Sequence, residues 1–148
     1  MNARNYVLTI TVIVLILFFY TGMEKIWYHS VFHIMLRKQP LPSWMKDILD
    51  WGLPLGELVL TALLTITRTR LYGLWGSAIA MLLFAGYTAY AASAPAGKTV
   101  CACGKLFSGL SWEAHFWVNM GLAAMAFTGI LVYHRNKRKT PQPLVDGR

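Results

Sequence analysis

The sequence predicts an all-α membrane protein, a bundle of four transmembrane helices with one or two interfacial helices between the first two spans. Hydrophobic residues make up 56% of the 148 residues and charged residues only 14%, whereas charged residues form roughly 25% of a typical soluble domain. Four apolar stretches are each long enough to cross a bilayer core, which requires roughly 17–25 residues in a helix. The basic residues lie beside these stretches, as they do at the ends of membrane spans.

The same distribution of charge argues against nucleic-acid binding. The net charge is +8, but a nucleic-acid-binding protein needs its basic residues on one face of a soluble domain. Here the basic residues are divided among the segments that connect apolar runs. The partners we expect are therefore membrane lipid and other proteins, with no nucleic acid.

The first predicted span covers residues 6–22, YVLTITVIVLILFFYTG, which contains no charged residue. A signal peptide would also begin near the start of a sequence, but it would end at a small-residue cleavage site. The chain continues with TGMEKIW instead, so we interpret this segment as an uncleaved span. Its many β-branched residues are no objection, because a helix satisfies the backbone of an isolated segment in lipid.

Residues 23–50 connect the first two spans and are too many for a tight turn. Apolar residues at 27, 31, 34 and 35 have helical spacing, and Pro40 and Pro42 end that helix. Ser43 has an N-capping side chain and opens a second amphipathic segment, residues 43–49. We therefore expect one or two helices that lie on the membrane surface.

The other three spans are predicted at residues 51–67, 71–92 and 114–133. The first turns of the second span contain Pro54, Gly56 and Glu57, so these turns should face protein or the interface. The third is rich in Gly and Ala, which favours close packing between helices. Residues 1–134 would form a single domain, followed by a basic tail at residues 135–148 that is predicted to be disordered.

The basic residues also predict the orientation of the bundle. If the N-terminus is cytoplasmic, the cytoplasmic segments hold one acid, Asp146, and eight basic residues: Arg4, Arg68, Arg70, Arg135, Lys137, Arg138, Lys139 and Arg148. The opposite segments hold six basic residues, Lys25, Arg37, Lys38, Lys46, Lys98 and Lys105, and four acids, Glu24, Asp47, Asp50 and Glu113. The positive-inside rule then places both termini in the cytoplasm and residues 93–113 outside.

The only two cysteines of the chain are Cys101 and Cys103, in the outer segment between the third and fourth spans. Disulfides persist in the oxidising compartment outside the cytoplasm. A disulfide across one intervening residue is strained, which favours exchange, and it closes too short a loop to stabilise much. We therefore interpret Cys101 and Cys103 as a redox pair. Lys98 and Lys105 flank it and would favour a thiolate, although both can equally be solvated loop charges.

Two other interpretations of the cysteines remain open. The thiolates could bind Cu(I) or zinc, with His29 and His33 as further ligands because they lie four residues apart on one helical face. The chain would then be a copper-binding or scaffolding assembly factor without catalytic turnover. Alternatively the two thiols are inert, and the chain is a structural subunit of a larger membrane complex.

Four further residues are candidates for supporting roles. Glu57 is an ionisable group inside a predicted span, where it needs a partner. We expect Lys25 to pair with it, and our hypothesis is that this ion pair orients the cysteine loop. Trp112 and His115 stand where the fourth span begins. His115 could relay protons during thiol exchange, or both residues could belong to the interfacial aromatic belt.

The order of these features resembles the MauE/DoxX-like group of redox-associated four-helix membrane proteins, over about residues 15–133. The residues that carry the resemblance follow one another along the chain: Gly22, Glu24, Lys25, Pro54, Glu57, Cys101, Cys103, Gly104, Trp112 and Asn119. The resemblance implies a bundle related to membrane thiol oxidoreductases of the vitamin K epoxide reductase type, in a bacterial inner membrane. MauE proteins are associated with disulfide formation or transport in a periplasmic partner, the small subunit of methylamine dehydrogenase.

DoxX-like relatives are linked to sulfur-compound oxidation with quinone as the acceptor, so the resemblance also makes quinone a candidate cofactor. Quinone-linked disulfide generators usually carry two cysteine pairs, whereas this chain has one. We therefore expect a periplasmic thioredoxin-like or disulfide-containing protein to supply or remove the electrons. Catalytic turnover as a thiol–disulfide oxidoreductase is implied by the resemblance, not by the residues alone.

Overall fold

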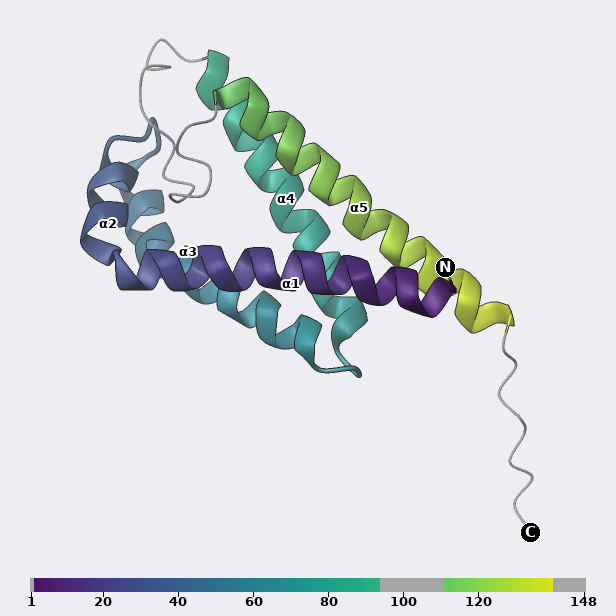
Figure 1. Ribbon diagram of the computed structural model, residues 1–148. Helices are drawn as coiled ribbons and strands as arrows, with labels where there is room; N and C mark the ends of the chain where they lie inside the picture. Colours follow the sequence, from purple (N-terminus) through teal and green to yellow (C-terminus); the bar gives the residue numbers. More distant parts are fainter. Residues whose placement is uncertain (1, 94–110, 140–148) are drawn as a thin grey trace.

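The structure is a computed structural model that describes residues 2–93 and 111–139. These residues form five α-helices and, within the described ranges, no strand: α1 (Ala3–Trp27), α2 (His29–Arg37), α3 (Ser43–Thr65), α4 (Arg70–Ser93) and α5 (Trp112–Lys139) (Figure 1). Four of them, α1, α3, α4 and α5, are long and apolar enough to cross a membrane by length and composition. The predicted all-α membrane fold is confirmed.

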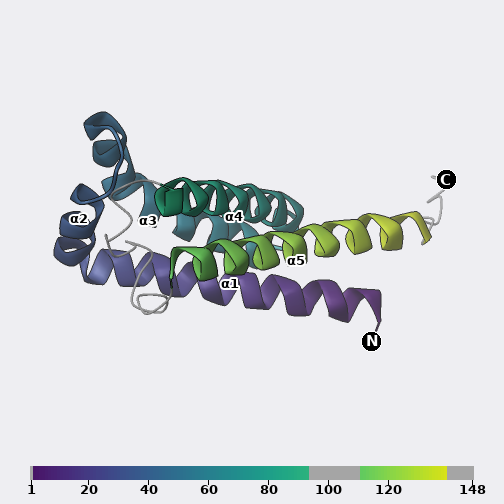
Figure 2. The same cartoon turned by 90° about the horizontal axis from the view of Figure 1, so that it is seen from above.

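The four long helices pack side by side as a bundle. Helix α4 lies along α5, α1 packs against both α3 and α5, and α3 packs against α4 (Figures 1 and 2). Small residues bring the helices close together in α4 and α5, because Ala78, Ala85 and Ala126 are almost completely buried. The Gly and Ala content of the third span thus serves the packing that its composition predicted.

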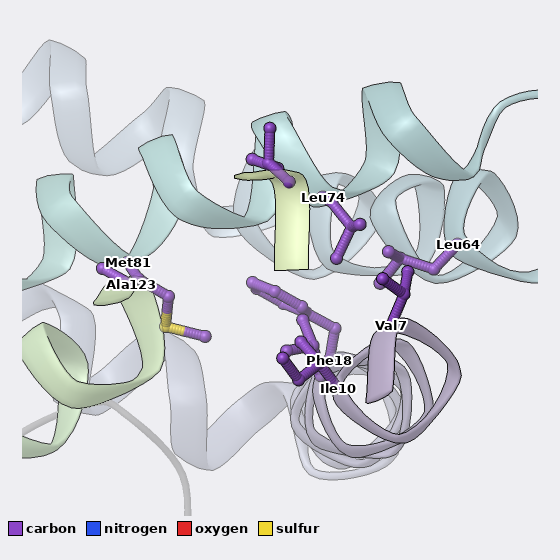
Figure 3. Close-up of a cluster of buried hydrophobic side chains, with 9 residues drawn as sticks. Val7, Ile10, Phe18, Leu64, Leu74, Met81 and Ala123 are labelled. Atoms are coloured by element: carbon purple, nitrogen blue, oxygen red, sulfur yellow. The ribbon is translucent and has the colours of Figure 1, made fainter. Parts of the chain in front are cut away.

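One stripe of α1 supplies much of the apolar core. Val7, Ile10, Val14 and Phe18 follow one another at intervals of three or four residues and are nearly inaccessible, so they share one face of the helix. They meet buried side chains of the other three long helices, among them Leu64, Leu74, Met81, Ala123 and Ile130 (Figure 3). The opposite faces of the helices expose large apolar side chains such as Leu83, which is 70% exposed. Apolar faces of this size would be unfavourable in water, so we interpret them as surfaces that contact membrane lipid.

Two elements between the first spans differ from their predicted limits. Glu24 to Trp27 continue α1 instead of opening a surface helix, and the chain leaves the helix only at Tyr28, before α2. Residues 43–49 are not a separate helix but the first turns of α3, which runs without a break through Pro54. No helix-breaking residue separates the two predicted segments, and membrane helices tolerate an internal proline.

The ends of the four long helices lie at two opposite ends of the bundle (Figures 1 and 2). The last turn of α1, all of α2, the start of α3, the end of α4 and the start of α5 lie together, and we call this the α2 end. Both described chain termini lie at the other end, where the Tyr6 hydroxyl of α1 is 3.3 Å from the Thr128 hydroxyl of α5.

Helix α5 is longer than the predicted fourth span. It continues to Lys139, so the prediction of a disordered tail is wrong for residues 135–139. A helix with an apolar span at its start can extend into the basic run, because Arg and Lys are good helix formers. Residues 140–148 of the predicted tail lie outside the described residues.

Candidate functional site

A buried ion pair joins α1 to α3 near the α2 end. The Lys25 ammonium donates to both carboxylate oxygens of Glu57, at 2.9 and 3.0 Å, and to the backbone oxygen of Thr21 at 3.3 Å. Lys25 is only 4% and Glu57 only 5% exposed. Each charge therefore finds its counter-charge inside the protein, which is what an ionisable group within a span requires. The ion pair expected from the sequence is present.

Gly22 allows this ion pair to form. A Cβ atom at Gly22 would lie 3.2 Å from Glu57 Cβ and 3.3 Å from Leu58 Cδ2, which is tighter than ordinary van der Waals contact. Lys25 follows Gly22 by three residues, so both face α3. Pro54 precedes Glu57 by the same interval and is buried on the same helix face. The close approach of α1 and α3 thus brings the Lys25 ammonium and the Glu57 carboxylate together.

A cavity of about 440 Å³ lies beside the ion pair, enclosed by residues of all five helices and of the α2–α3 connection. Most of its lining is apolar, with Leu17, Phe18, Met81 and Leu122 on the side toward the middle of the bundle. Its polar lining residues are Lys25, Gln39, Glu57, Tyr87, His115 and Asn119, together with Thr21. The arrangement is that of a ligand pocket, a mainly hydrophobic space with a few polar groups.

A second polar contact closes the α2 end of this cavity. The Tyr87 hydroxyl of α4 donates a hydrogen bond to Gln39 Oε1, and the Gln39 amide donates to the Met35 backbone oxygen at 3.1 Å. Gln39 is buried, so these bonds satisfy an amide that would otherwise be costly. The contact fastens the α2–α3 connection to α4.

His115 lines the same end of the cavity, and Trp112 lies beside His115. His115 is 3% exposed, and its Nδ1 lies 3.1 Å from the Ser111 backbone oxygen. A carbonyl only accepts, so Nδ1 carries the proton in this bond. The Trp112 ring meets Tyr87 edge-on, with 6.1 Å between ring centroids, and lies 6.4 Å from His115. The Ser111 hydroxyl caps α5 by accepting from the Ala114 backbone N–H at 3.2 Å.

The two histidines considered as further metal ligands, His29 and His33, both lie beside a carboxylate. His33 Nδ1 lies 3.0 Å and His29 Nε2 3.5 Å from the Asp50 carboxylate, and the His29 ring stacks on Trp51 with centroids 4.2 Å apart. Together they fasten α2 to α3. Over residues 2–93 and 111–139, no group of three or more His, Cys, Asp or Glu side chains is arranged to hold a metal ion.

Several predicted site residues lie outside the described residues, namely Lys98, Cys101, Cys103 and Lys105. The structure shows only where the segment that contains these residues is attached to the helices. It is attached at the α2 end, between Ser93 of α4 and Ser111 before α5. Of the remaining candidates, the structure brings Lys25, Glu57 and His115 to one cavity. Sequence reasoning missed Gln39 and Tyr87, because their sequence context is only weakly informative. Gln39 is a polar residue beside Pro40, and Tyr87 is a polar residue inside a Gly- and Ala-rich span.

These features define a multi-pass helical membrane protein whose bundle encloses a buried ion pair and a mainly apolar cavity. A family model described as methylamine utilisation protein MauE matches residues 3–132. The chain belongs to the MauE family, and the resemblance seen in its motifs is confirmed for that family. No curated protein and no solved structure matches the chain.

Proposed function

We propose that this MauE-family protein is a membrane thiol–disulfide exchange protein of the bacterial inner membrane. Cys101 and Cys103 exchange disulfides or electrons with a periplasmic partner, a thioredoxin-like protein or a disulfide-containing protein that methylamine utilisation needs. The observation that carries the proposal is the Cys-x-Cys pair itself, formed by the only two cysteines of the chain. It lies within the segment that joins α4 to α5 at the α2 end.

The charge distribution supports the side of the membrane on which the exchange takes place. Arg68 and Arg70 lie in or next to the short α3–α4 connection, and short flanking segments weigh most in the positive-inside rule. That connection is at the opposite end of the bundle from the end of α4 and the start of α5, between which the cysteine segment is attached (Figure 1). A cytoplasmic α3–α4 connection therefore goes with a periplasmic cysteine segment, where disulfides persist.

The exchange itself requires no other reactant. When the pair starts as a disulfide, a partner thiolate attacks one sulfur, the Cys101–Cys103 bond breaks, and the other cysteine leaves as a thiolate. The second partner thiol then attacks the mixed disulfide and releases the partner in its oxidised form. Two electrons pass to Cys101 and Cys103, and the partner's two thiol protons are released. The reverse sequence reduces the partner.

The residues at the α2 end support this exchange by positioning and by proton transfer. The Lys25–Glu57 ion pair holds α1 and α3 together, and we propose that it steadies the end of the bundle that carries the cysteine segment. His115 lies in the first turn of α5, four residues after Ser111, and we propose that it relays the protons that thiols release. Trp112 packs between Tyr87 and His115.

The test is thiol labelling in membranes across a series of redox buffers with a membrane-impermeant reagent. We expect labelling from outside and a midpoint potential in the range of about −120 to −230 mV found for exchange catalysts. Each single variant, Cys101→Ser or Cys103→Ser, should trap a mixed disulfide with the partner, and the double variant should trap none. A pair that never oxidises, or labels only from the cytoplasm, would refute the proposal.

A charge swap tests the supporting role of the ion pair. Lys25→Glu and Glu57→Lys should each lower exchange activity, and the double variant should restore it, because the interaction is then reversed but intact. A double variant that folds and stays inactive would show that the ion pair does not act by positioning.

A further inference from the structure

We propose that the cavity between the helices binds one membrane-soluble molecule that has an apolar body and an oxygen-bearing end. This inference does not depend on the cysteines and goes beyond thiol exchange. The cavity measures about 440 Å³, within the range of roughly 300–1,000 Å³ that small-molecule sites occupy. An empty space of this size would leave its lining without packing partners, and its apolar walls do not suit a cluster of water.

The lining indicates how the molecule lies. Leu17, Phe18, Met81 and Leu122 form the inner part of the cavity, and Phe18 and Met81 also belong to the apolar core. The polar lining residues are nearer the α2 end, where the Tyr87 hydroxyl meets Gln39. An apolar body therefore packs toward the middle of the bundle, and the oxygen-bearing end points toward the α2 end.

The polar groups also limit the charge of the molecule. Among the described lining residues, Lys25 and Glu57 are the charged ones, and they neutralise one another through two hydrogen bonds. A charged ligand end would find no counter-charge left among these residues. The Asn119 amide lines the same cavity and can donate two hydrogen bonds. A carbonyl or ester oxygen, neutral and accepting, is the group that these surroundings recognise.

The position of the cavity indicates that its ligand comes from the bilayer. Helices α1 and α5 meet near the start of α1 and separate toward the α2 end (Figure 1). The cavity lies where they have separated, because its α1 lining begins at Leu17 and its α5 lining ends at Leu122. Both helices are long and apolar enough to span a membrane by length and composition, so the cavity lies among membrane-spanning helices, and membrane components are the nearest source of a ligand. Two membrane components carry the required chemistry, an isoprenoid quinone and an ester-linked acyl lipid.

The experiment is native mass spectrometry of the full chain purified from membranes, followed by addition of two probes, a decyl-substituted benzoquinone and a dilauroyl glycerol. Val118→Phe fills the cavity, because Val118 lines it. Its matched control is Val59→Phe, which adds the same atoms at a position that is 58% exposed. We expect one bound molecule per chain in the wild type and in Val59→Phe, and an occupancy reduced about tenfold or more in Val118→Phe.

A second pair of variants tests the polar end and keeps the test valid if Val118→Phe fails to fold. Asn119→Leu removes the amide at nearly constant volume and should weaken binding of the preferred probe about fivefold, the usual worth of one hydrogen bond. Asn5→Leu, at an exposed position, should leave binding unchanged. The Cys101→Ser/Cys103→Ser double variant should bind as the wild type does, even if thiol exchange proves absent.

Each outcome decides the proposal. A retained quinone, or binding of the benzoquinone probe alone, identifies a redox-active ligand. A retained diacylglycerol, or binding of the dilauroyl glycerol probe alone, identifies an acyl lipid. Either result supports the site. Absence of a stoichiometric ligand with both probes overturns it. Equal occupancy in Val118→Phe and Val59→Phe, or in Asn119→Leu and Asn5→Leu, also overturns it, because the bound molecule would then lie on the outer surface.

Discussion

Lys25 and Glu57 illustrate how one contact between two residues can decide whether two helices stay together. Both side chains are almost inaccessible, so removal of either leaves a buried charge without a partner. Breaking a buried pair in this way costs about 3–5 kcal/mol, although replacing both members with apolar residues can be nearly neutral. The pair therefore contributes more to the correct pairing of α1 with α3 than to the free energy of unfolding.

We predict that Glu57→Gln, Glu57→Leu and Lys25→Met each lower the free energy of unfolding by about 3–5 kcal/mol. The double variant Lys25→Met/Glu57→Leu should lose much less than the sum of its two single variants. Thermal unfolding in detergent, analysed as a double-mutant cycle, measures the difference.

The exposed ion pair at the same end of the bundle is the control. Arg37 and Asp47 form a salt bridge with side chains that are 43% and 60% exposed, so Arg37→Ala should cost less than about 1 kcal/mol. An effect of Glu57→Gln as small as that of Arg37→Ala would contradict the energetic role given to the buried pair.

At the scale of the helices, the sequence predicts which elements exist better than where they end. All four spans were predicted from length and apolar composition, because lipid demands a helix of that kind. The ends could not be predicted in the same way. Residues 43–49 look amphipathic because the first turns of α3 lie beside α2. Only the three-dimensional structure shows that these residues and the second span form one helix that continues through Pro54.

The α3–α4 hairpin yields a prediction about close packing of helices. A Cβ atom at Gly73 would lie 2.9 Å from the Leu64 backbone nitrogen, and backbone cannot move aside as a flexible side chain can. We predict that Gly73→Ala destabilises the protein by about 1–3 kcal/mol, the usual cost of overpacking. The melting temperature in detergent measures this loss.

Gly86, on the same helix, provides the matched control. Within residues 2–93 and 111–139, no atom beyond the neighbouring backbone of α4 lies within 4 Å of a Cβ placed there. Gly86→Ala should therefore stabilise α4 or leave it unchanged, since alanine is the better helix former by about 0.5–1 kcal/mol. Equal losses in both variants would mean that glycine is needed throughout α4 for another reason.

For the molecule as a whole, the sequence predicts the polar site only in part. Glu57 inside a span required a positive partner, and Lys25 follows the neighbouring span, so their pairing could be inferred. The cavity could not be inferred, because it depends on how far α1 and α5 separate. Nor could the Tyr87–Gln39 contact, which joins residues that lie 48 positions apart.

The arrangement of the helix ends predicts which surface residues face the same side of the membrane. In a Cys101→Ser/Cys103→Ser background, Lys38→Cys at the α2 end should react with an impermeant thiol reagent added outside intact cells. Thr67→Cys, in the α3–α4 connection, should react only after the membrane is permeabilised. Both positions are exposed, so accessibility to water does not explain a difference. Labelling of both from one side would rule out a bundle with these ends on opposite sides.

The buried ion pair also has a consequence for how the protein is made. Helix α1 leaves the ribosome well before α3, since 32 residues separate Lys25 from Glu57. Until the two helices associate, each newly inserted segment holds an unpaired charge at or within the membrane, where it is costly. A chain whose helices pair wrongly keeps that charge exposed to lipid, where proteases of the membrane quality-control system can recognise it. The double variant Lys25→Met/Glu57→Leu would remove both charges, so wrongly assembled chains of that variant should persist longer in the cell than those of the wild type.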